Sequence, residues 1–346
     1  MFDKDPLWLI LYRRLHINSF TKSLLFSFGI GAITFIIIPY FSGYLLPRTG
    51  ILNSLSDWPG FVITFFTHPA IYVFYLYQQE IIFLRLQQEL NKSQSEGNNP
   101  FSENYIRAAT NSKLTPIIAL FLTSIGYFLH IQAVLSHPTF SYYYPNKFIL
   151  YFINAPTSSL AGYMVCLIGI RYLSVTVSLM RLAIKQPLNV NIYHQDKRGG
   201  LAFLGKYIFE SFILVSIMAV DLSLLFVINL YQTYRNPFTE PSFMSFIFIY
   251  TILLPAGFIL PLLIFRNSIN SRIRLIIHGL DKVGDFEKGI DFEINKPYLN
   301  KINSEAINKI QNLHTMPIDN STLLKFTILF LFSVSPIGLL LYYYLN

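Results

Sequence analysis

The stretch SLLFSFGIGAITFIIIPYFSGYL, residues 23–45, contains no charged residue. A run of this length and composition is typical of a helix that crosses a lipid bilayer, which needs roughly 17–25 mainly apolar residues. The rest of the chain has a similar character, since 53% of its 346 residues are hydrophobic and 13% are charged. An ordinary soluble domain carries about 25% charged residues. The composition therefore favours a membrane protein over a domain surrounded by water.

Seven segments are long and apolar enough to span a membrane, and they predict an all-α polytopic helix bundle. A closed β-barrel would show alternating apolar and polar residues instead. The seven segments form a single integral membrane domain over residues 1–346. They are 23–45, 60–82, 115–136, 158–182, 205–230, 244–265 and 323–344.

The basic residues predict the orientation of the bundle. With the N-terminus in the cytoplasm, nineteen of the 26 Lys and Arg residues lie in cytoplasmic segments and three lie outside. Cytoplasmic loops of membrane proteins carry such an excess. The split favours an odd number of spans with the C-terminus outside, in a bacterial inner membrane or a plasma membrane.

The net charge of +8 has a direct explanation in this topology. Basic residues near a membrane are attracted to anionic lipid headgroups by about 1 kcal/mol each. Membrane lipids are therefore the expected partners, and a homo-oligomer is left open. Nucleic-acid binding is not expected, because it needs a concentrated basic face, and here the charges are spread over four loops.

Two parts outside the spans read as amphipathic helices. Residues 6–20, PLWLILYRRLHINSF, mix apolar and basic side chains, which predicts a short helix lying on the membrane surface. Residues 266–322 form the largest cytoplasmic loop, and their first part is expected to continue the sixth span as a helix. That sixth span contains Pro255 and Pro261. These prolines indicate either a static kink, which is common in membrane helices, or a helix that hinges during gating; the leading expectation makes this span the moving element.

Three charged residues fall inside predicted spans, where ionisable groups are costly and often functional. They are Arg171, Glu210 and Asp221. Glu210 and Asp221 are eleven residues apart and share one helix face, roughly 16 Å apart along the axis. Arg171 and Glu210 come at similar depths on consecutive helices, which predicts a contact between them. Such a contact would be either a structural ion pair or part of a polar path.

The loop NVNIYHQDKRGGLAFLGKY, residues 189–207, gathers His194, Asp196, Arg198, Gly199 and Gly200 between two spans. In one reading His194 and Asp196 cap and tie the loop. In a second reading the five residues bind a phosphate-bearing ligand, because amides at a helix start favour an anion. Both readings stay open from sequence.

A third reading of this loop is a metal or catalytic site. His194 and Asp196 offer two ligands, and a metal ion needs more. His278 and Asp281, in the last cytoplasmic loop, are candidates for the others. No motif of a known catalytic class occurs in the chain, so the sequence identifies neither a catalytic residue nor a cofactor.

The pattern HxDxxGGLxFLG after a proline resembles a signature of poorly characterised bacterial multi-pass membrane proteins. Those proteins usually carry proline where this chain has Gln195, and the likeness covers residues 187–205. The resemblance implies that His194, Asp196, Gly199 and Gly200 form a motif, and it implies no particular activity.

The leading expectation is a transporter, channel or receptor-like protein with a polar path along the fifth span, coupled to the HxDxxGG loop. An alternative is a membrane-embedded enzyme that acts on a lipid or a phosphorylated substrate at the inner surface. A third is a non-catalytic scaffold subunit. A transport protein is expected to show a water-accessible cavity that reaches Asp221 or Glu210, and a scaffold is expected to show a dry, tightly packed bundle.

Overall fold

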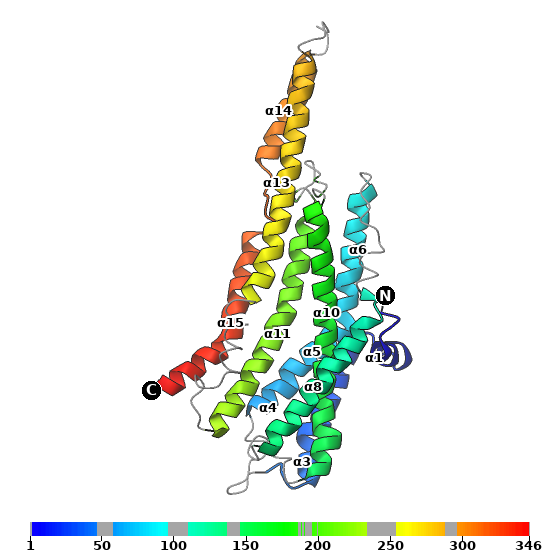
Figure 1. The fold of residues 1–346 in the computed structure, drawn as a ribbon, viewed down its shortest axis with the longest axis vertical. Helices are drawn as coiled ribbons and strands as arrows, with labels where there is room; N and C mark the ends of the chain where they lie inside the picture. Colours follow the sequence, from blue (N-terminus) through cyan, green and yellow to red (C-terminus); the bar gives the residue numbers. More distant parts are fainter. Residues whose placement is uncertain are drawn as a thin grey trace.

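The computed structural model describes residues 2–46, 58–95, 110–136, 146–185, 188, 190, 196–198, 200–233, 254–287 and 296–345. Every regular element within these ranges is helical. The molecule is elongated, and its long helices run along the long axis (Figure 1). The predicted all-α class is confirmed for the described part of the chain.

The helices carry two kinds of label, α for α-helix and η for π-helix. In chain order they are α1 (Pro6–Trp8), η1 (Leu9–Arg14), α2 (Phe20–Ala32), η2 (Ile33–Ile37), α3 (Ile38–Phe41), α4 (Trp58–Val62), η3 (Ile63–Thr67), α5 (His68–Val73), η4 (Phe74–Gln78), α6 (Gln79–Ser95), α8 (Leu114–Ser136), α9 (Lys147–Ile149), η6 (Leu150–Asn154), α10 (Ala155–Lys185), α11 (Ala202–Thr233), α13 (Leu254–Glu287), α14 (Lys296–Gln311) and α15 (Asn320–Leu345).

Three continuous helical stretches are long and apolar enough to cross a membrane. They are Phe20–Phe41, Gly60–Asn91 and Lys147–Lys185. The first, second and fourth predicted spans lie largely or wholly within them. The third, fifth and seventh predicted spans correspond to α8, α11 and α15, and part of the sixth, residues 244–253, lies outside the described residues.

The outer surface of the bundle is rich in large apolar side chains. Leu25 and Phe41 on the first candidate span are 65% and 83% exposed, and Phe121 on α8 is 65% exposed. Contiguous apolar surface of this kind in a soluble protein would drive association. A lipid environment accounts for it on helices of this length.

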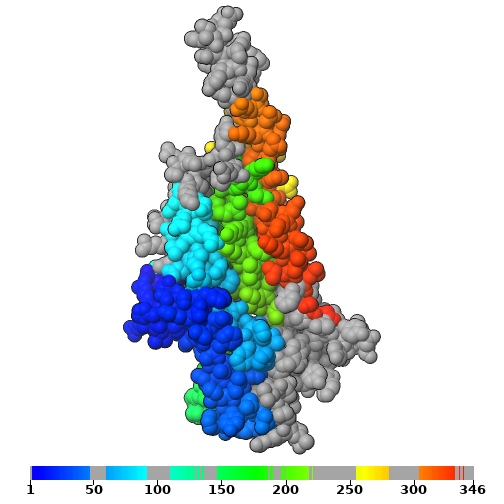
Figure 2. Space-filling model, turned by 180° about the vertical axis from the view of Figure 1, so that it is seen from behind, coloured from blue at the N-terminus to red at the C-terminus, as the bar shows by residue number. Residues whose placement is uncertain are grey.

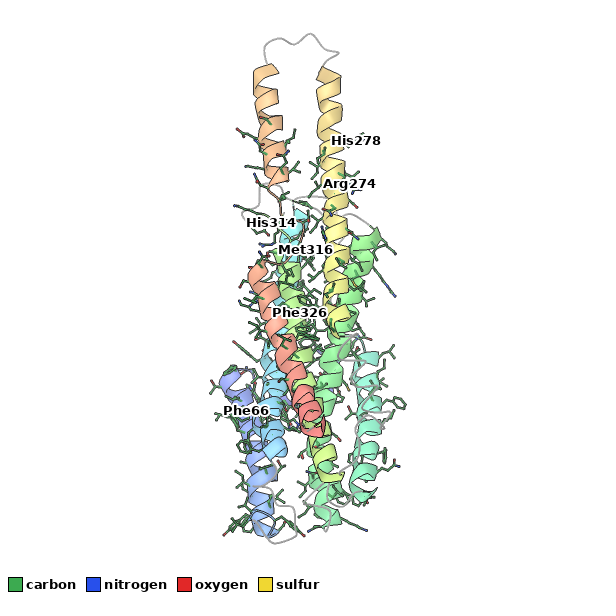
Figure 3. The ribbon with its side chains drawn as sticks, turned by 90° about the vertical axis from the view of Figure 1, so that its left-hand side faces the viewer. Phe66, Arg274, His278, His314, Met316 and Phe326 are labelled. Atoms are coloured by element: carbon green, nitrogen blue, oxygen red, sulfur yellow. The ribbon has the colours of Figure 1, made fainter. Side chains whose placement is uncertain are left out.

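Helix α13 extends well beyond the bundle and forms a hairpin with α14 (Figures 1 and 3). This confirms that one helix continues from the predicted sixth span into residues 266–287, and that part of the following segment is helical. Within the bundle, α13 packs on α10 and α11, and α15 packs on α11. The rings of Phe212, Phe258 and Phe326 join these helices, with Phe258 and Phe326 stacked at 3.9 Å between centroids.

The N-terminal segment is helical, as predicted, and it also packs on the bundle. Elements α1 and η1 lie against the side of the bundle (Figure 2). Phe2, Trp8 and Leu11 are buried, and the Phe2 ring contacts Phe83 of α6 at 6.1 Å between centroids. Burial raises the pKa of the neighbouring Tyr12 to about 12. Part of the apolar face therefore packs on protein, a contact that amphipathicity alone does not predict. The position of this helix on the membrane surface stays a prediction.

We expect Gly205→Ala to destabilise the fold strongly. A Cβ at Gly205, near the start of α11, would lie 2.1 Å from the Pro317 carbonyl oxygen and 2.5 Å from Ile318 Cγ2. Overpacking of this kind typically costs 1–3 kcal/mol. The measurement is the free energy of unfolding in mixed detergent micelles.

Gly162→Ala is the matched control, because nothing lies within 4 Å of a Cβ built at that position in α10. Alanine favours helix more than glycine does, so this variant should be neutral or slightly more stable. Equal stability of the two variants would contradict the close contact between α11 and the segment before α15.

Candidate functional site

A buried ion pair joins the N-terminal segment to the bundle. The Arg171 guanidinium donates to Asp5 Oδ2 at 2.8 Å and to Gln79 Oε1 at 3.0 Å. The Tyr75 hydroxyl donates to the same Asp5 oxygen at 2.7 Å, and the Phe2 ring lies 4.3 Å from the guanidinium carbon. Asp5, Gln79, Arg171 and Tyr75 are all at most 1% exposed. Each charge is thus paired and hydrogen-bonded, as burial requires.

The predicted contact between Arg171 and Glu210 is wrong. Arg171 pairs with Asp5, and Glu210 pairs with Arg85 of α6 at 3.0 Å. The adjacent residue, Tyr172, faces α11, because its ring stacks on Tyr207 and its carbonyl accepts from the Tyr207 hydroxyl. One residue along an α-helix is a rotation of about 100°. The similar depth of Arg171 and Glu210 in the sequence therefore does not predict which helix face Arg171 occupies.

The other predicted intramembrane groups lie on α11. Glu210 has a side chain that is 14% exposed, and it sits one turn from the exposed Lys206. Asp221 belongs to the same helix, as expected, but its side chain lies outside the described residues. The described part of α11 therefore supports an ion pair to α6 and leaves the predicted path along this helix untested.

Asp196 caps the start of α11. Its Oδ1 accepts hydrogen bonds from the amides of Arg198 and Gly200 at 2.8 and 3.0 Å, and its Oδ2 accepts from Ala202 at 3.3 Å. Gly200 has φ 78°, a conformation that glycine adopts at low cost. The carboxylate thus occupies the amides that the anion-binding reading requires, which favours the structural reading of this loop. His194 and Gly199 lie outside the described residues.

The loop also ties α11 to the segment before α15. The His314 amide donates to the Lys197 carbonyl at 2.8 Å, and Lys197 itself has φ 53°, which is rare for a non-glycine residue. Asp319 caps α15 through the Thr322 amide, and hydrogen bonds from Thr322 hold the pKa of Asp319 below its ordinary value. His314 and Met316 lie between the hairpin and α15 (Figure 3).

The proposed metal ligands are not brought together among the described residues. No group of three His, Cys, Asp or Glu side chains with suitable spacing occurs within those ranges. His278 is exposed on the projecting part of α13 (Figure 3). The side chain of Asp281 and the whole of His194 lie outside the described ranges.

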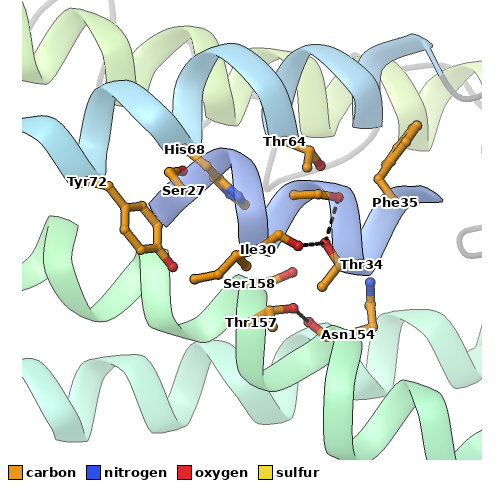
Figure 4. Close-up of a pocket in the computed structure, with 11 residues that line it drawn as sticks. Ser27, Ile30, Thr34, Phe35, Thr64, His68, Tyr72, Asn154, Thr157 and Ser158 are labelled. Carbon is orange, nitrogen blue, oxygen red and sulfur yellow. Dashed lines mark hydrogen bonds between the residues drawn. The ribbon is translucent and has the colours of Figure 1, made fainter. Parts of the chain in front are cut away.

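A polar cavity of about 40 Å³ lies between the three candidate spans (Figure 4). One probe-sized water needs roughly 10–15 Å³, so the cavity has room for a few waters or one small ion. Eight side chains of its lining carry hydroxyl, amide or imidazole groups. They are Ser27, Thr34, Thr64, His68, Tyr72, Asn154, Thr157 and Ser158.

Three π-helices meet at this cavity, and each ends two residues before a proline. The segments η2, η3 and η6 end at 37, 67 and 154, and Pro39, Pro69 and Pro156 follow. Proline has no N–H and clashes with the carbonyl four residues earlier. A wider turn relieves that clash, and such turns are frequent at functional sites.

The three segments share a sequence pattern. ITFIIIP at 33–39, ITFFTHP at 63–69 and LYFINAP at 150–156 all read as Ile or Leu, then Thr or Tyr, then Phe, with proline four residues later. The first residue of each pattern begins a π-helix. This recurrence is the sequence signal that could have located the cavity.

A polar stripe on the second candidate span links the cavity to the buried ion pair. Thr64, His68 and Tyr72 line the cavity, and Tyr75 and Gln79 contact Asp5 and Arg171. In Figure 4, Tyr72 extends from this span toward α10. At 1.5 Å per residue the stripe is roughly 22 Å long, a large part of a hydrocarbon core of about 30 Å.

Comparison of the chain with family models, with curated proteins and with solved structures gave no match. The likeness of the HxDxxGG loop to bacterial multi-pass membrane proteins therefore stays an expectation.

We expect Asp5→Ala to lower the free energy of unfolding by about 3–5 kcal/mol, because it leaves the Arg171 guanidinium buried without a counter-charge. The measurement is SDS-induced unfolding in mixed micelles. The control is Asp3→Ala, which removes the exposed pair with Arg13 and should cost less than about 1 kcal/mol. A similar decrease in the free energy of unfolding for the two variants would contradict a stabilising role of the buried pair.

We expect Asp196→Ala to lower stability by about 1–2 kcal/mol, the usual range for loss of a helix cap, while Asp196→Asn retains most of it. The same unfolding measurement applies, with proteolysis of the loop as a second readout. An Asp196→Ala protein with unchanged stability and loop protection would instead favour a ligand-binding role for this carboxylate.

Proposed function

We propose that this protein is a multi-pass membrane transporter or channel that carries a small hydrophilic solute along a polar path inside its helix bundle. The cavity between the three candidate spans is the observation that carries this proposal. Polar groups inside a membrane bundle are costly, and they commonly mark substrate or ion pathways.

In the proposed topology the chain crosses the membrane seven times, with its N-terminus in the cytoplasm and its C-terminus outside. The distribution of Lys and Arg supports this orientation. The membrane is a bacterial inner membrane or a plasma membrane, and anionic headgroups contact the basic cytoplasmic segments. This topology puts the cavity in the outer half of the bundle and the ion pair of Asp5 and Arg171 in the inner half.

The path follows the second span rather than the fifth. Polar side chains of the second span reach from the cavity to Gln79, which contacts Arg171. On α11, by contrast, Glu210 is bound to Arg85. Two adjoining sites, the cavity and the buried ion pair, therefore support a path along the second span. Only the types of residue on α11 support a path along the fifth span.

The N-terminal segment closes the inner end of this path. Asp5 and Phe2 fill the space beside Tyr75, Gln79 and Arg171, and each is at most 1% exposed. A solute that reached the cavity from outside would meet this barrier next. In this conformation the path is open to one side of the membrane at most. Alternating access and a closed gate both require such a state.

The π-helices provide the means of movement. A proline lacks one backbone hydrogen bond and bends its helix, and three such prolines, Pro39, Pro69 and Pro156, follow the π-helices that contribute to the cavity. Because all three spans can bend at the level of the cavity, the two halves of the bundle can tilt about that level.

We expect Thr64→Val to reduce solute flux about tenfold, the effect of one lost polar contact of roughly 1.4 kcal/mol. The measurement is flux into liposomes that contain the purified protein, across a panel of ions and small polar solutes. Thr67→Val is the control, because the Thr67 hydroxyl donates to the Ile63 carbonyl and Thr67 is not part of the cavity lining.

Wild-type flux that falls in Thr64→Val and persists in Thr67→Val supports a path through the cavity. Equal flux in both variants would move the path elsewhere, with Glu210 and Asp221 as the next positions to change. No flux above empty liposomes for any solute overturns the transport proposal, since the receptor-like, enzymatic and scaffold alternatives all predict that result.

A further inference from the structure

We infer that Arg171 and Tyr75 form a binding site for the carboxylate group of a small organic acid, and that Asp5 occupies this site in the present conformation as an internal ligand. The inference rests on the proposed function and names the class of its solute. Four observations support it: the donors that meet at Asp5, the N–H groups that stay unsatisfied, the polar stripe that leads to the site, and the charge of Arg171.

The first observation is the set of donors that meet at one oxygen of Asp5. Asp5 Oδ2 accepts from Arg171 Nη2 at 2.8 Å and from the Tyr75 hydroxyl at 2.7 Å. Gln79 positions the guanidinium, because its Oε1 accepts from Arg171 Nη1 at 3.0 Å and its amide donates to the Tyr75 carbonyl. The planar guanidinium matches the geometry of a carboxylate. These groups therefore form a complete carboxylate site, and its present ligand is a side chain of the same chain.

The second observation is that Asp5 satisfies only half of the guanidinium edge that it contacts. The Nε–H and one Nη2–H of an arginine are parallel and match the two oxygens of a carboxylate. Asp5 accepts only from Nη2, because its other oxygen accepts from the Trp8 amide at 3.1 Å as the cap of α1. The buried Arg171 Nε has no acceptor among the described residues. A carboxylate that is not tied to a helix cap can accept from both nitrogens.

A second buried donor of this arrangement is also unsatisfied. Trp8 is 2% exposed, and its Nε1 has no partner in the described part of the chain. A buried N–H without an acceptor costs free energy that hydration would recover. Withdrawal of the N-terminal segment would give water access to the Trp8 indole and would free the Arg171 edge for a better ligand. Both effects favour exchange of Asp5 for a solute.

The third observation is the polar stripe that leads from the cavity to this site. Thr64, His68 and Tyr72 line the cavity, and Tyr75 and Gln79 follow on the same candidate span. Among the described residues, the lining contains no Asp or Glu that would repel an anion (Figure 4). A volume of about 40 Å³ has room for a few waters. The solute is therefore limited to a few non-hydrogen atoms, as in acetate.

The fourth observation is the charge of Arg171, which is 1% exposed. Removal of one partner from a buried ion pair leaves an uncompensated charge and is strongly unfavourable. Withdrawal of Asp5 is therefore costly unless another anion takes its place. A solute carboxylate neutralises Arg171 as Asp5 does, so the inner end of the path opens more readily when the solute has arrived. Exchange of one carboxylate for the other thus couples solute binding to opening.

The test is equilibrium binding of ¹⁴C-labelled acetate to the purified full-length chain in nanodiscs. We expect saturable binding to the wild-type protein. Binding to Asp5→Ala should be tighter by about tenfold or more, because removal of the competing carboxylate raises the fraction of protein that can bind. Acetate should also raise the free energy of unfolding of Asp5→Ala, since a ligand of the folded state stabilises it.

Two variants test the donors directly. Arg171→Lys keeps the positive charge beside Asp5 and loses the planar pair of N–H groups, so it should bind acetate more weakly by about tenfold or more. Tyr75→Phe removes one donor and no charge, and it should weaken binding by about tenfold. The second variant keeps the Asp5–Arg171 pair, so it tests the site even where Arg171→Lys does not fold.

Arg85→Lys is the matched control. Arg85 also donates to a carboxylate, that of Glu210 at 3.0 Å, but its side chain is 40% exposed and it lies outside the site. Its affinity for acetate should equal that of the wild-type protein. Equal weakening in Arg85→Lys and Arg171→Lys would overturn the assignment of the site to Arg171.

Two results of the binding experiment would overturn the inference outright. One is absence of saturable acetate binding to the wild-type protein, even if Asp5→Ala binds, because the site would then exist only in the variant. The other is displacement of acetate by chloride as effectively as by formate, because any positive charge would then account for the binding.

Liposome flux separates failure of this inference from failure of the proposed function. Flux of another solute without acetate binding leaves the transport proposal standing and removes the carboxylate site. Acetate binding without flux of any solute keeps the site and removes transport.

Discussion

A guanidinium in the interior of a membrane bundle has to be neutralised by a carboxylate, and much of this structure depends on how Arg171 meets that requirement. Its counter-charge comes from Asp5, 166 residues away in the chain, which draws α1 and η1 into the bundle. Tyr75 and Gln79 add hydrogen bonds to this pair, and these bonds fix which face of the second candidate span points inward. The same face carries Thr64, His68 and Tyr72 into the cavity.

Sequence reasoning succeeds here for features that depend on length and composition. Three features follow from apolar length and periodicity. They are the helix over residues 23–41, the long helix α11 and the continuation of α13 past Arg266. It fails where the partner of a side chain has to be chosen. Arg171 and Glu210 share a depth but not a face, and Asp5 precedes the first span in a segment that gives no sign of burial. Long-range pairing is absent from local pattern, so only the fold reveals it.

The candidate sites also differ in how far the sequence predicts them. Asp196 was visible as a residue before a helix start, and its capping bonds follow from that position. The cavity was not visible as a site, because its lining is made of Thr, Ser and Asn residues that are ordinary in membrane helices. The pattern of Ile or Leu, then Thr or Tyr, then Phe, with proline four residues after the Phe, marks it. The meaning of that pattern depends on three candidate spans meeting at one level.

Helix α13 has a mechanical consequence. It runs without interruption from Phe265 and Ile269, which are at most 1% exposed, to the exposed His278 on its projecting part. An α-helix of this length behaves as a rod, and Pro261 lies near its buried end. A force applied to the hairpin with α14 would therefore be transmitted along α13 to the packed Phe265 and Ile269 and on to the stacked rings of Phe258 and Phe326. A displacement of the projecting hairpin would thus also displace side chains that are packed within the bundle.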